Sequence, residues 1–185
     1  MEITAAMVKE LRSQSGAGIM ECKSALKETQ GDLEEAITFL RKKGLAKADK
    51  KSDRQTSEGV IGSYIHQGSK VGVMLELNCE TDFVANTPDF QTLVKDIAMH
   101  IAAAKPRFAT REEVTEVILE KEREIFAHQA KESGKPENII EKIVTGKMEK
   151  FYEENCILEQ PFIKDTNVTI GELIKQKIAL LGENI

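Results

Sequence analysis

A length of 185 residues allows one ordinary hydrophobic core or two small ones. The composition excludes disordered, collagen-like and low-complexity chains, because 41% of the residues are hydrophobic and 31% charged, with only 4 prolines and 12 glycines. The net charge of −5 provides no general attraction to nucleic acid or to anionic membranes. No apolar run approaches the roughly 18 residues that span a bilayer, and the first ten residues lack a signal-peptide pattern, so we expect a cytoplasmic protein.

Cysteine and histidine are too scattered to form a standard catalytic or metal site. Cys22, Cys79 and Cys156 lie far apart and show neither a CxxC pattern nor zinc-ligand spacing, so we expect reduced, buried thiols. The three histidines are equally dispersed, and the chain has no Walker loop, HExxH, GxGxxG or Ser/His/Asp order. We therefore expect no enzymatic activity, no cofactor and no metal.

The N-terminal residues 4–44 predict three short helices packed into one small unit. Thr4 is expected to cap the first helix, which stops at "SGAG" (15–18), where glycines can supply positive φ in a tight turn. Asp32 begins a capping-box pattern for the third helix, and Gly44 is expected to close it. A unit of about 40 residues is near the lower limit for independent folding, so we expect a partner to share its surface.

The segment "AKADKKSDRQTSE" (46–58) loses all apolar periodicity and alternates acidic and basic residues. This pattern is typical of a solvated linker. A basic arm that binds nucleic acid is the alternative, and the interleaved acids disfavour it.

From residue 59 the hydrophobic period changes to two. The stretches "GVIGSYIH", "QGSK" and "VGVMLELNC" predict a β-hairpin with one apolar face. A two-stranded hairpin is not stable alone, so a helix should cover that face. The next segment provides one, with Thr87 as its cap and Pro88 in its first position. On the second strand the apolar face carries Val71, Val73, Leu75, Leu77 and Cys79, and the other face carries Gly72, Met74, Glu76 and Asn78.

Two longer helices follow. Thr110 and Glu113 form a capping box that predicts a helix over residues 110–132, and "SGKP" (133–136) turns the chain into a second helix over 137–153. Such a pair makes an antiparallel hairpin roughly 30 Å long. Its charged outer faces predict that it projects from the body of the protein, the alternative being a hairpin folded flat on the core.

The C-terminal part predicts a short apolar piece, a turn and one more helix, capped by Thr169 with Glu172 and ended by Gly182. The fold class expected from these elements is α+β. It consists of an N-terminal three-helix domain, then a small antiparallel sheet packed with helices, with a protruding antiparallel helical hairpin.

The stretch "NCETDFVAN" (78–86) links the predicted strand to the helix that covers it, and it places Asp82 beside Phe83. In one interpretation Asp82 caps a helical turn and Phe83 belongs to the core. Metal binding is a weak alternative, because Glu80 is the single other acid nearby and cannot complete an octahedral shell. In a third interpretation the pair inserts into a partner, since aromatic side chains in pockets dominate interface energetics. Insertion requires both side chains to be exposed.

Five stretches of the chain stand out in one order: "VKELRSQSGAGIMECKSAL" (8–26), "GDLEEAI" (31–37), "NCETDFVAN" (78–86), "IAMHIAAAKPRF" (97–108) and "SGKPENIIEKIVTGKMEKF" (133–151). Together they resemble the elongation factor Ts family, the guanine nucleotide exchange factors of the translational GTPase elongation factor Tu. The resemblance covers nearly the whole chain, and the "TDFV" corner is its most specific part.

The resemblance implies a translation elongation factor in protein biosynthesis that promotes GDP release without covalent chemistry. The family's Thr-Asp-Phe-Val segment, here Thr81, Asp82, Phe83 and Val84, enters the GTPase beside its magnesium and nucleotide site. Phe83 would wedge into an apolar pocket, and Asp82 would disturb the groups that hold magnesium. Loss of the metal uncovers phosphate charge, so GDP leaves faster.

The resemblance also implies that the helical head docks on the nucleotide-binding domain of the GTPase. Arg12 and Met20 match contact positions of the family, and His66 matches another. The structural alternatives are a core position for Met20 and a solvated surface charge for Arg12. The competing function is an interaction adaptor that binds a partner through the head and uses the "TDFV" corner only structurally.

Domain boundaries follow from the same resemblance. Residues 1–45 would form a ubiquitin-associated-like domain and 46–58 a linker. Residues 59–109 together with 157–185 would form an α+β dimerisation core, into which 110–156 is inserted as a helical hairpin, or coiled coil.

Assembly is likewise inferred from the family's short form, which has one hairpin-and-helix module. Members similar to it dimerise, so the resemblance implies a homodimer that binds two GTPases in a 2:2 complex. It implies no direct nucleic-acid partner and no membrane. Short members usually continue past "GENI" into a further strand, and we expect that strand to be missing here.

Overall fold

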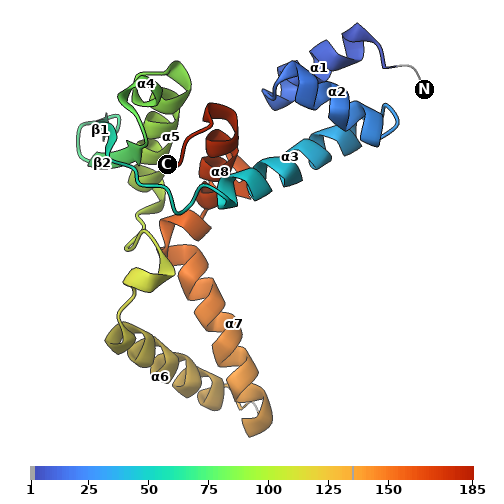
Figure 1. Cartoon of the computed structure of the whole chain (residues 1–185). Helices are drawn as coiled ribbons and strands as arrows, with labels where there is room; N and C mark the ends of the chain where they lie inside the picture. Colours follow the sequence, from blue (N-terminus) through green and yellow to red (C-terminus); the bar gives the residue numbers. More distant parts are fainter. Residues whose placement is uncertain (1–2, 135) are drawn as a thin grey trace. The chain divides into compact units, whose positions relative to one another are not determined.

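The computed structural model describes residues 3–134 and 136–185, and its fold is α+β, as the sequence predicts. The chain divides into two compact units, whose elements can be followed in Figure 1. The first unit comprises Met1–Gly62, Met74–Lys95 and Ile174–Ile185, and the second comprises Ser63–Val73 and Asp96–Leu173.

The first unit begins with the three predicted helices, α1 (Ala5–Ser15), α2 (Ile19–Glu28) and α3 (Leu33–Asp49). The predicted N-terminal caps of α1 and α3 are confirmed. The hydroxyl of Thr4 accepts a hydrogen bond from the Met7 amide at 3.3 Å, and the Asp32 carboxylate accepts one from the Glu35 amide at 2.8 Å. Gly16 ends α1 at φ 67°, whereas Gly18 has φ −62° and precedes α2. The core of this bundle consists of Leu11, Cys22, Ala25, Leu26 and Ala36, all fully buried.

The predicted end of the third helix at Gly44 is wrong, because α3 continues to Asp49. A Cβ atom at Gly44 would lie 3.2 Å from the Cβ of Ala179 in α8 (Ile170–Leu181), tighter than most Cβ contacts. Glycine at this position therefore permits a close approach of two helices. It does not stop the helix, and the first residues of the predicted linker are helical.

Strands β1 (Glu58–Ile65) and β2 (Gly72–Cys79) form the predicted hairpin. On β2 burial alternates as predicted from Val73 to Leu77, and Met74 on the opposite face is 79% exposed, whereas Asn78 is half-buried. The prediction for Val71 is wrong, because it precedes the strand and is exposed. Helix α5 (Pro88–Ala104) covers the apolar face, with Phe90 and Val94 buried in the same cluster as Cys79. A Cβ at Gly62 would lie only 2.2 Å from a methyl group of Val94, so the absence of a side chain allows the strand and the helix to meet.

The second unit contains the helical pair α6 (Glu116–Glu132) and α7 (Glu137–Asn155), which pack along each other (Figure 1). The predicted start at Thr110 is wrong. Residues Arg111–Glu113 form a separate 3₁₀ turn, η1, and Val114 then adopts an extended conformation. Val114 is buried against the helical pair, and this burial favours the break over a continuous helix. Of the predicted turn between the helices, Lys135 lies outside the described residues.

The sequence did not predict the second small sheet. After the 3₁₀ turn η2 (Ile157–Glu159), strand β3 (Pro161–Phe162) pairs antiparallel with β4 (Asp165–Thr169). Helix α8 follows directly, and its predicted capping box is confirmed. The Glu172 amide donates to the Thr169 hydroxyl at 3.1 Å, and the Thr169 amide donates to the Glu172 carboxylate at 3.2 Å. Gly182 follows the helix at φ 85°.

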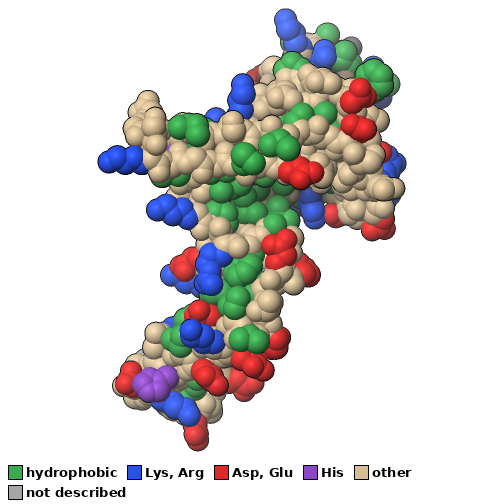
Figure 2. Space-filling view, turned by 90° about the vertical axis from the view of Figure 1, so that its left-hand side faces the viewer, with side chains coloured by type: hydrophobic (Ala, Val, Ile, Leu, Met, Phe, Trp, Pro, Cys, Tyr) green, Lys and Arg blue, Asp and Glu red, His purple; other side chains and the backbone are tan. Residues whose placement is uncertain are grey.

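All three cysteines are free and buried, as the sequence predicts. On the face shown in Figure 2, acidic and basic side chains lie interspersed. Within the described residues, each helix is too short or too polar to cross a lipid bilayer.

Candidate functional site

The corner between β2 and α5 is a single helical turn, α4 (Asp82–Ala85). Thr81 precedes it in an extended conformation, and its hydroxyl accepts a hydrogen bond from the Val84 amide at 3.4 Å. The carbonyl of Thr81 accepts a further bond from the Ala85 amide at 3.2 Å. The interpretation of Asp82 as the helix cap is therefore wrong, because Thr81 fills that position.

The corner has an exposed face and a buried face. Phe83 is 82% exposed, and Asp82 beside it is also exposed. Val84 is half-buried, and Ala85 lies fully inside the cluster that contains Phe90. The interpretation of Phe83 as a core residue is wrong. The turn packs Val84 and Ala85 against the core and presents an acid and a phenyl ring to solvent.

Side chains that follow the turn hold its backbone. The Asn86 amide group donates to the carbonyl of Asp82 at 2.8 Å, and the Thr87 hydroxyl donates to that of Val84 at 2.8 Å. Gln91, one turn into α5, donates to the carbonyl of Ala85 at 2.7 Å. The carbonyls of Asp82 and Val84 also accept backbone bonds, from the Asn86 amide at 3.1 Å and the Thr87 amide at 3.0 Å, so the side chains reinforce the turn.

Residues after Gly182 hold the corner from its other side, and sequence reasoning missed them. The carboxylate of Glu183 accepts two hydrogen bonds from Thr81, one from its amide at 2.9 Å and one from its hydroxyl at 2.7 Å. The Asn184 amide donates to the Glu80 carboxylate at 2.7 Å. These partners lie more than 100 residues apart in the chain, and no local pattern signals such pairs.

Two titratable groups beside the corner are shifted by these contacts. The hydrogen bond from Asn184 and the positive charge of Arg54, 3.4 Å away, hold the pKa of Glu80 below its ordinary value. Burial, reinforced by the negative charge of Glu183, raises the pKa of the Cys79 thiol. The thiol donates to the Thr81 carbonyl at 3.1 Å. At neutral pH, Glu80 is therefore a carboxylate and Cys79 a neutral thiol.

The other predicted contact residues are exposed as well. Arg12 lies on the outer surface of α1, and Met20, near the start of α2, is 76% exposed beside Ile19 at 55%. The interpretation of Met20 as a core residue is therefore wrong. His66 follows β1 in the second unit, and its Nδ1 lies 3.1 Å from the hydroxyl of Tyr64.

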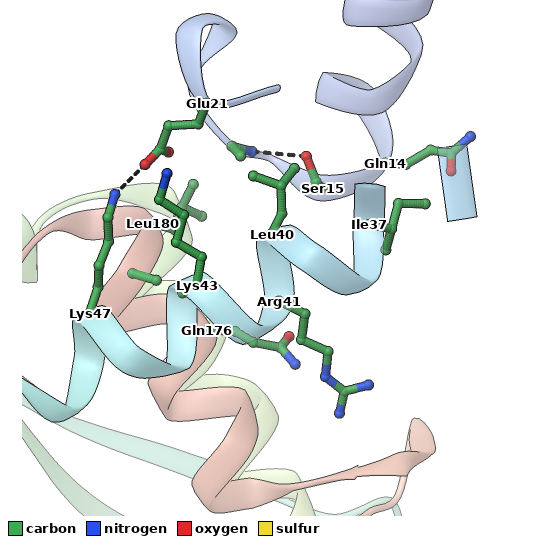
Figure 3. Close-up of a pocket in the computed structure, with 13 residues that line it drawn as sticks. Gln14, Ser15, Glu21, Ile37, Leu40, Arg41, Lys43, Lys47, Gln176 and Leu180 are labelled. Carbon is green, nitrogen blue, oxygen red and sulfur yellow. Dashed lines mark hydrogen bonds and ion pairs between the residues drawn. The ribbon is translucent and has the colours of Figure 1, made fainter. Parts of the chain in front are cut away.

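A separate pocket of about 210 Å³ lies in the first unit between the three-helix bundle and α8 (Figure 3). Leu40 and Leu180 contribute apolar surface, and Lys47 forms an ion pair with Glu21 at its edge. That bond lowers the pKa of Glu21. Glu21 is the one acid in the lining, so the pocket lacks a pair of carboxyl groups for acid–base catalysis. Across the described ranges, no three His, Cys, Asp or Glu residues gather as a metal site.

Comparison with known proteins identifies relatives over the full chain. The family model described as Elongation factor TS matches residues 1–184. The elongation factor Ts of Fervidobacterium nodosum is 62% identical over 185 residues, which cover 100% of this chain and 94% of the relative. That of Solibacter usitatus is 59% identical over 184 residues, covering 100% and 87%. That of Thermosipho melanesiensis is 56% identical over 183 residues, covering 99% and 93%.

Proposed function

The chain belongs to the elongation factor Ts family of translation elongation factors, and from this premise we propose that it promotes GDP release from elongation factor Tu. It acts as a guanine nucleotide exchange factor, performs no covalent chemistry, and works in the cytoplasm. The Thr81–Val84 segment is the part that enters the GTPase near its magnesium and nucleotide.

The observation that carries this proposal is the exposure of Phe83 on a turn whose backbone is held. A phenyl ring that is 82% exposed leaves apolar surface in water, which a partner pocket can bury. The hydrogen bonds to Asp82, Val84 and Ala85 fix the turn before binding, so less conformational entropy is lost when Phe83 is inserted.

In the proposed mechanism Phe83 fills an apolar pocket of the GTPase, and Asp82 competes for the groups that hold magnesium. Without the metal, the phosphate charge of GDP is no longer neutralised, and the nucleotide dissociates faster. Because binding free energies are coupled reciprocally, the factor must bind the nucleotide-free GTPase more tightly than the loaded form. A new nucleotide then weakens the factor by the same ratio and releases it.

The remaining contacts and the assembly complete the proposal. Exposed Arg12 and Met20 dock the ubiquitin-associated-like head on the nucleotide-binding domain of elongation factor Tu, and His66 adds a further contact. A homodimer would present these surfaces to two GTPases in a 2:2 complex. Neither nucleic acid nor a membrane takes part.

The test is the release rate of fluorescent GDP from elongation factor Tu with no factor, with this chain, and with its Phe83→Ala variant. The matched control is Met74→Ala, which removes a similarly exposed side chain from the outer face of β2. Acceleration that Phe83→Ala largely loses and Met74→Ala keeps supports the proposal. Binding of the chain without any acceleration would refute it and favour the adaptor function.

A further inference from the structure

A one-turn helix such as α4 is not stable by itself, because the first turn fixes several backbone angles for very few hydrogen bonds. Its conformation must therefore come from contacts with other parts of the chain. Asn86, Thr87 and Gln91 provide such contacts at its C-terminal end. At its N-terminal end, two side chains bind the capping residue Thr81: the Cys79 thiol donates to its carbonyl, and Glu183, from the segment after α8, accepts from its amide and its hydroxyl.

Glu183 controls how Thr81 can act as a cap. A hydroxyl group has one proton to donate and two lone pairs that accept. The Thr81 hydroxyl donates its proton to the Glu183 carboxylate at 2.7 Å, and this bond holds the oxygen where a lone pair accepts from the Val84 amide at 3.4 Å. The second carboxylate oxygen accepts from the Thr81 amide at 2.9 Å. The two bonds together fix both the backbone and the side-chain rotamer of Thr81.

Asn184 anchors Glu183 in this position. Its backbone amide donates to Glu80, and its side chain donates to the carbonyls of Ser52 at 3.2 Å and Arg54 at 2.8 Å. Asn184 is 9% exposed, so these bonds are shielded from water. The segment after α8 is thus tied to the residues that follow β2 and to the segment that precedes β1.

From this geometry we propose that Glu183 and Asn184 are positioning residues for nucleotide exchange, which hold the Thr81–Val84 segment in the conformation that enters the GTPase. The inference rests on the proposed function. Neither residue needs to touch the GTPase, since each acts through Thr81 or Glu80. Loss of Glu183 frees the hydroxyl of Thr81, loosens the cap, and spreads Asp82 and Phe83 over several orientations.

The experiment measures GDP release from elongation factor Tu over a range of factor concentrations, for the natural chain and for Glu183→Ala. We expect the maximal release rate to fall about three- to tenfold, because charge-assisted hydrogen bonds that order the segment are lost. In Glu183→Gln the amide oxygen can accept from the Thr81 amide, and the amide nitrogen can donate to the hydroxyl. This conservative variant should therefore stay within about twofold of the natural chain.

The matched control is Lys177→Ala. Lys177 lies on α8 and forms an ion pair with Asp89 at 2.6 Å, with no contact to residues 81–84 among its hydrogen bonds and ion pairs given for the described chain. The Lys177→Ala variant should have a maximal release rate within about twofold of that of the natural chain, even if its Tm is lower. A purely structural role of Glu183 would lower the Tm and leave the maximal rate of folded protein unchanged, and this result would overturn the inference.

Thr81→Val provides an independent test where Glu183→Ala does not fold. It removes only the hydroxyl that joins Glu183 to Val84, and we expect a comparable fall in the maximal rate. An unchanged rate in this variant would overturn the inference. If the natural chain itself does not accelerate release, the proposed function fails. If the natural chain accelerates release and Glu183→Ala equals it, only the positioning role fails.

Discussion

Phe83 and Phe90 lie one helical turn and a short link apart, yet their environments are opposite. Phe83 is 82% exposed on α4, whereas Phe90 is fully buried on α5 beneath the β-hairpin. The same side chain stabilises the fold at one position and is left available for a partner at the other. The comparison teaches that residue type alone does not separate core from contact surface, since the path of the backbone decides it.

Histidine offers the same contrast in the second unit. His100 is 1% exposed, and its Nε2 lies 2.9 Å from the Gln160 side chain, while Nδ1 has no hydrogen-bond partner in the structure. His66 is exposed and close to the Tyr64 hydroxyl. Burial lowers the pKa of His100, so the fold favours its neutral form.

The largest expected effect on stability belongs to Phe90→Ala. Removal of a fully buried phenyl ring leaves a cavity, and we expect a loss of about 3–5 kcal/mol in the free energy of unfolding. Urea denaturation followed by circular dichroism measures it. In the same experiment Phe83→Ala should change the free energy by less than about 0.5 kcal/mol. Equal losses of unfolding free energy in the two variants would contradict the assignment of Phe90 to the core and Phe83 to the surface.

Phe83→Ala should instead affect exchange. Truncation of a central interface aromatic commonly removes about 2 kcal/mol of interaction, which corresponds to a roughly thirtyfold loss in the efficiency of GDP release. The measurement is the fluorescent GDP assay at factor concentrations below saturation. A loss of less than about threefold would show that the exposed ring is not the main contact.

The histidine contrast predicts a dependence on pH. His100 binds a proton more readily in the unfolded chain, so stability should fall as the pH decreases below about 6.5, by no more than about 1.4 kcal/mol per pH unit from this group. Urea midpoints between pH 7.5 and 5 measure the effect, and His100→Gln should make that dependence shallower. An unchanged dependence in His100→Gln would contradict the assignment.

The smallest expected effect comes from Met20→Ala. If the three-helix head provides affinity and the corner provides acceleration, this variant should raise the half-saturating concentration about fivefold, equivalent to about 1 kcal/mol. The maximal release rate should remain unchanged. Met74→Ala, with nearly the same exposure on the hairpin, should alter neither value. A fall in the maximal rate for Met20→Ala would contradict the division of roles, in which the head provides affinity and the corner provides acceleration.

Local sequence signals predicted much of the fold. The caps at Thr4, Asp32 and Thr169 are confirmed, because each depends on a partner within three residues. The predictions for the end of α3 and the start of α6 were wrong. Gly44 acts through its approach to Ala179, and the helix after Thr110 is broken where Val114 is buried. Both depend on tertiary contacts that periodicity does not show.

The candidate site shows the same limit. Its place between strand and helix follows from the change in hydrophobic period and from Thr87 and Pro88, which start α5 as predicted. That Thr81 is the cap, and that Glu183 binds it, could not be predicted. A Ser, Thr, Asp or Asn can cap a turn equally well, and the sequence pointed only to Asp82 as the cap. The contact with Glu183 spans 102 residues, so it exists only in the folded chain.

The long separation of Thr81 and Glu183 in the chain also determines the order in which parts of the protein can fold during synthesis. The helices α1 to α3 draw their core from the first 40 residues and can pack while the ribosome is still extending the chain. The corner is different, because β2, α4 and α5 are complete long before Glu183 has been translated. A nascent chain therefore carries the whole Thr81–Val84 segment without its anchor. The corner can take its anchored form only after Glu183 and Asn184 have been translated.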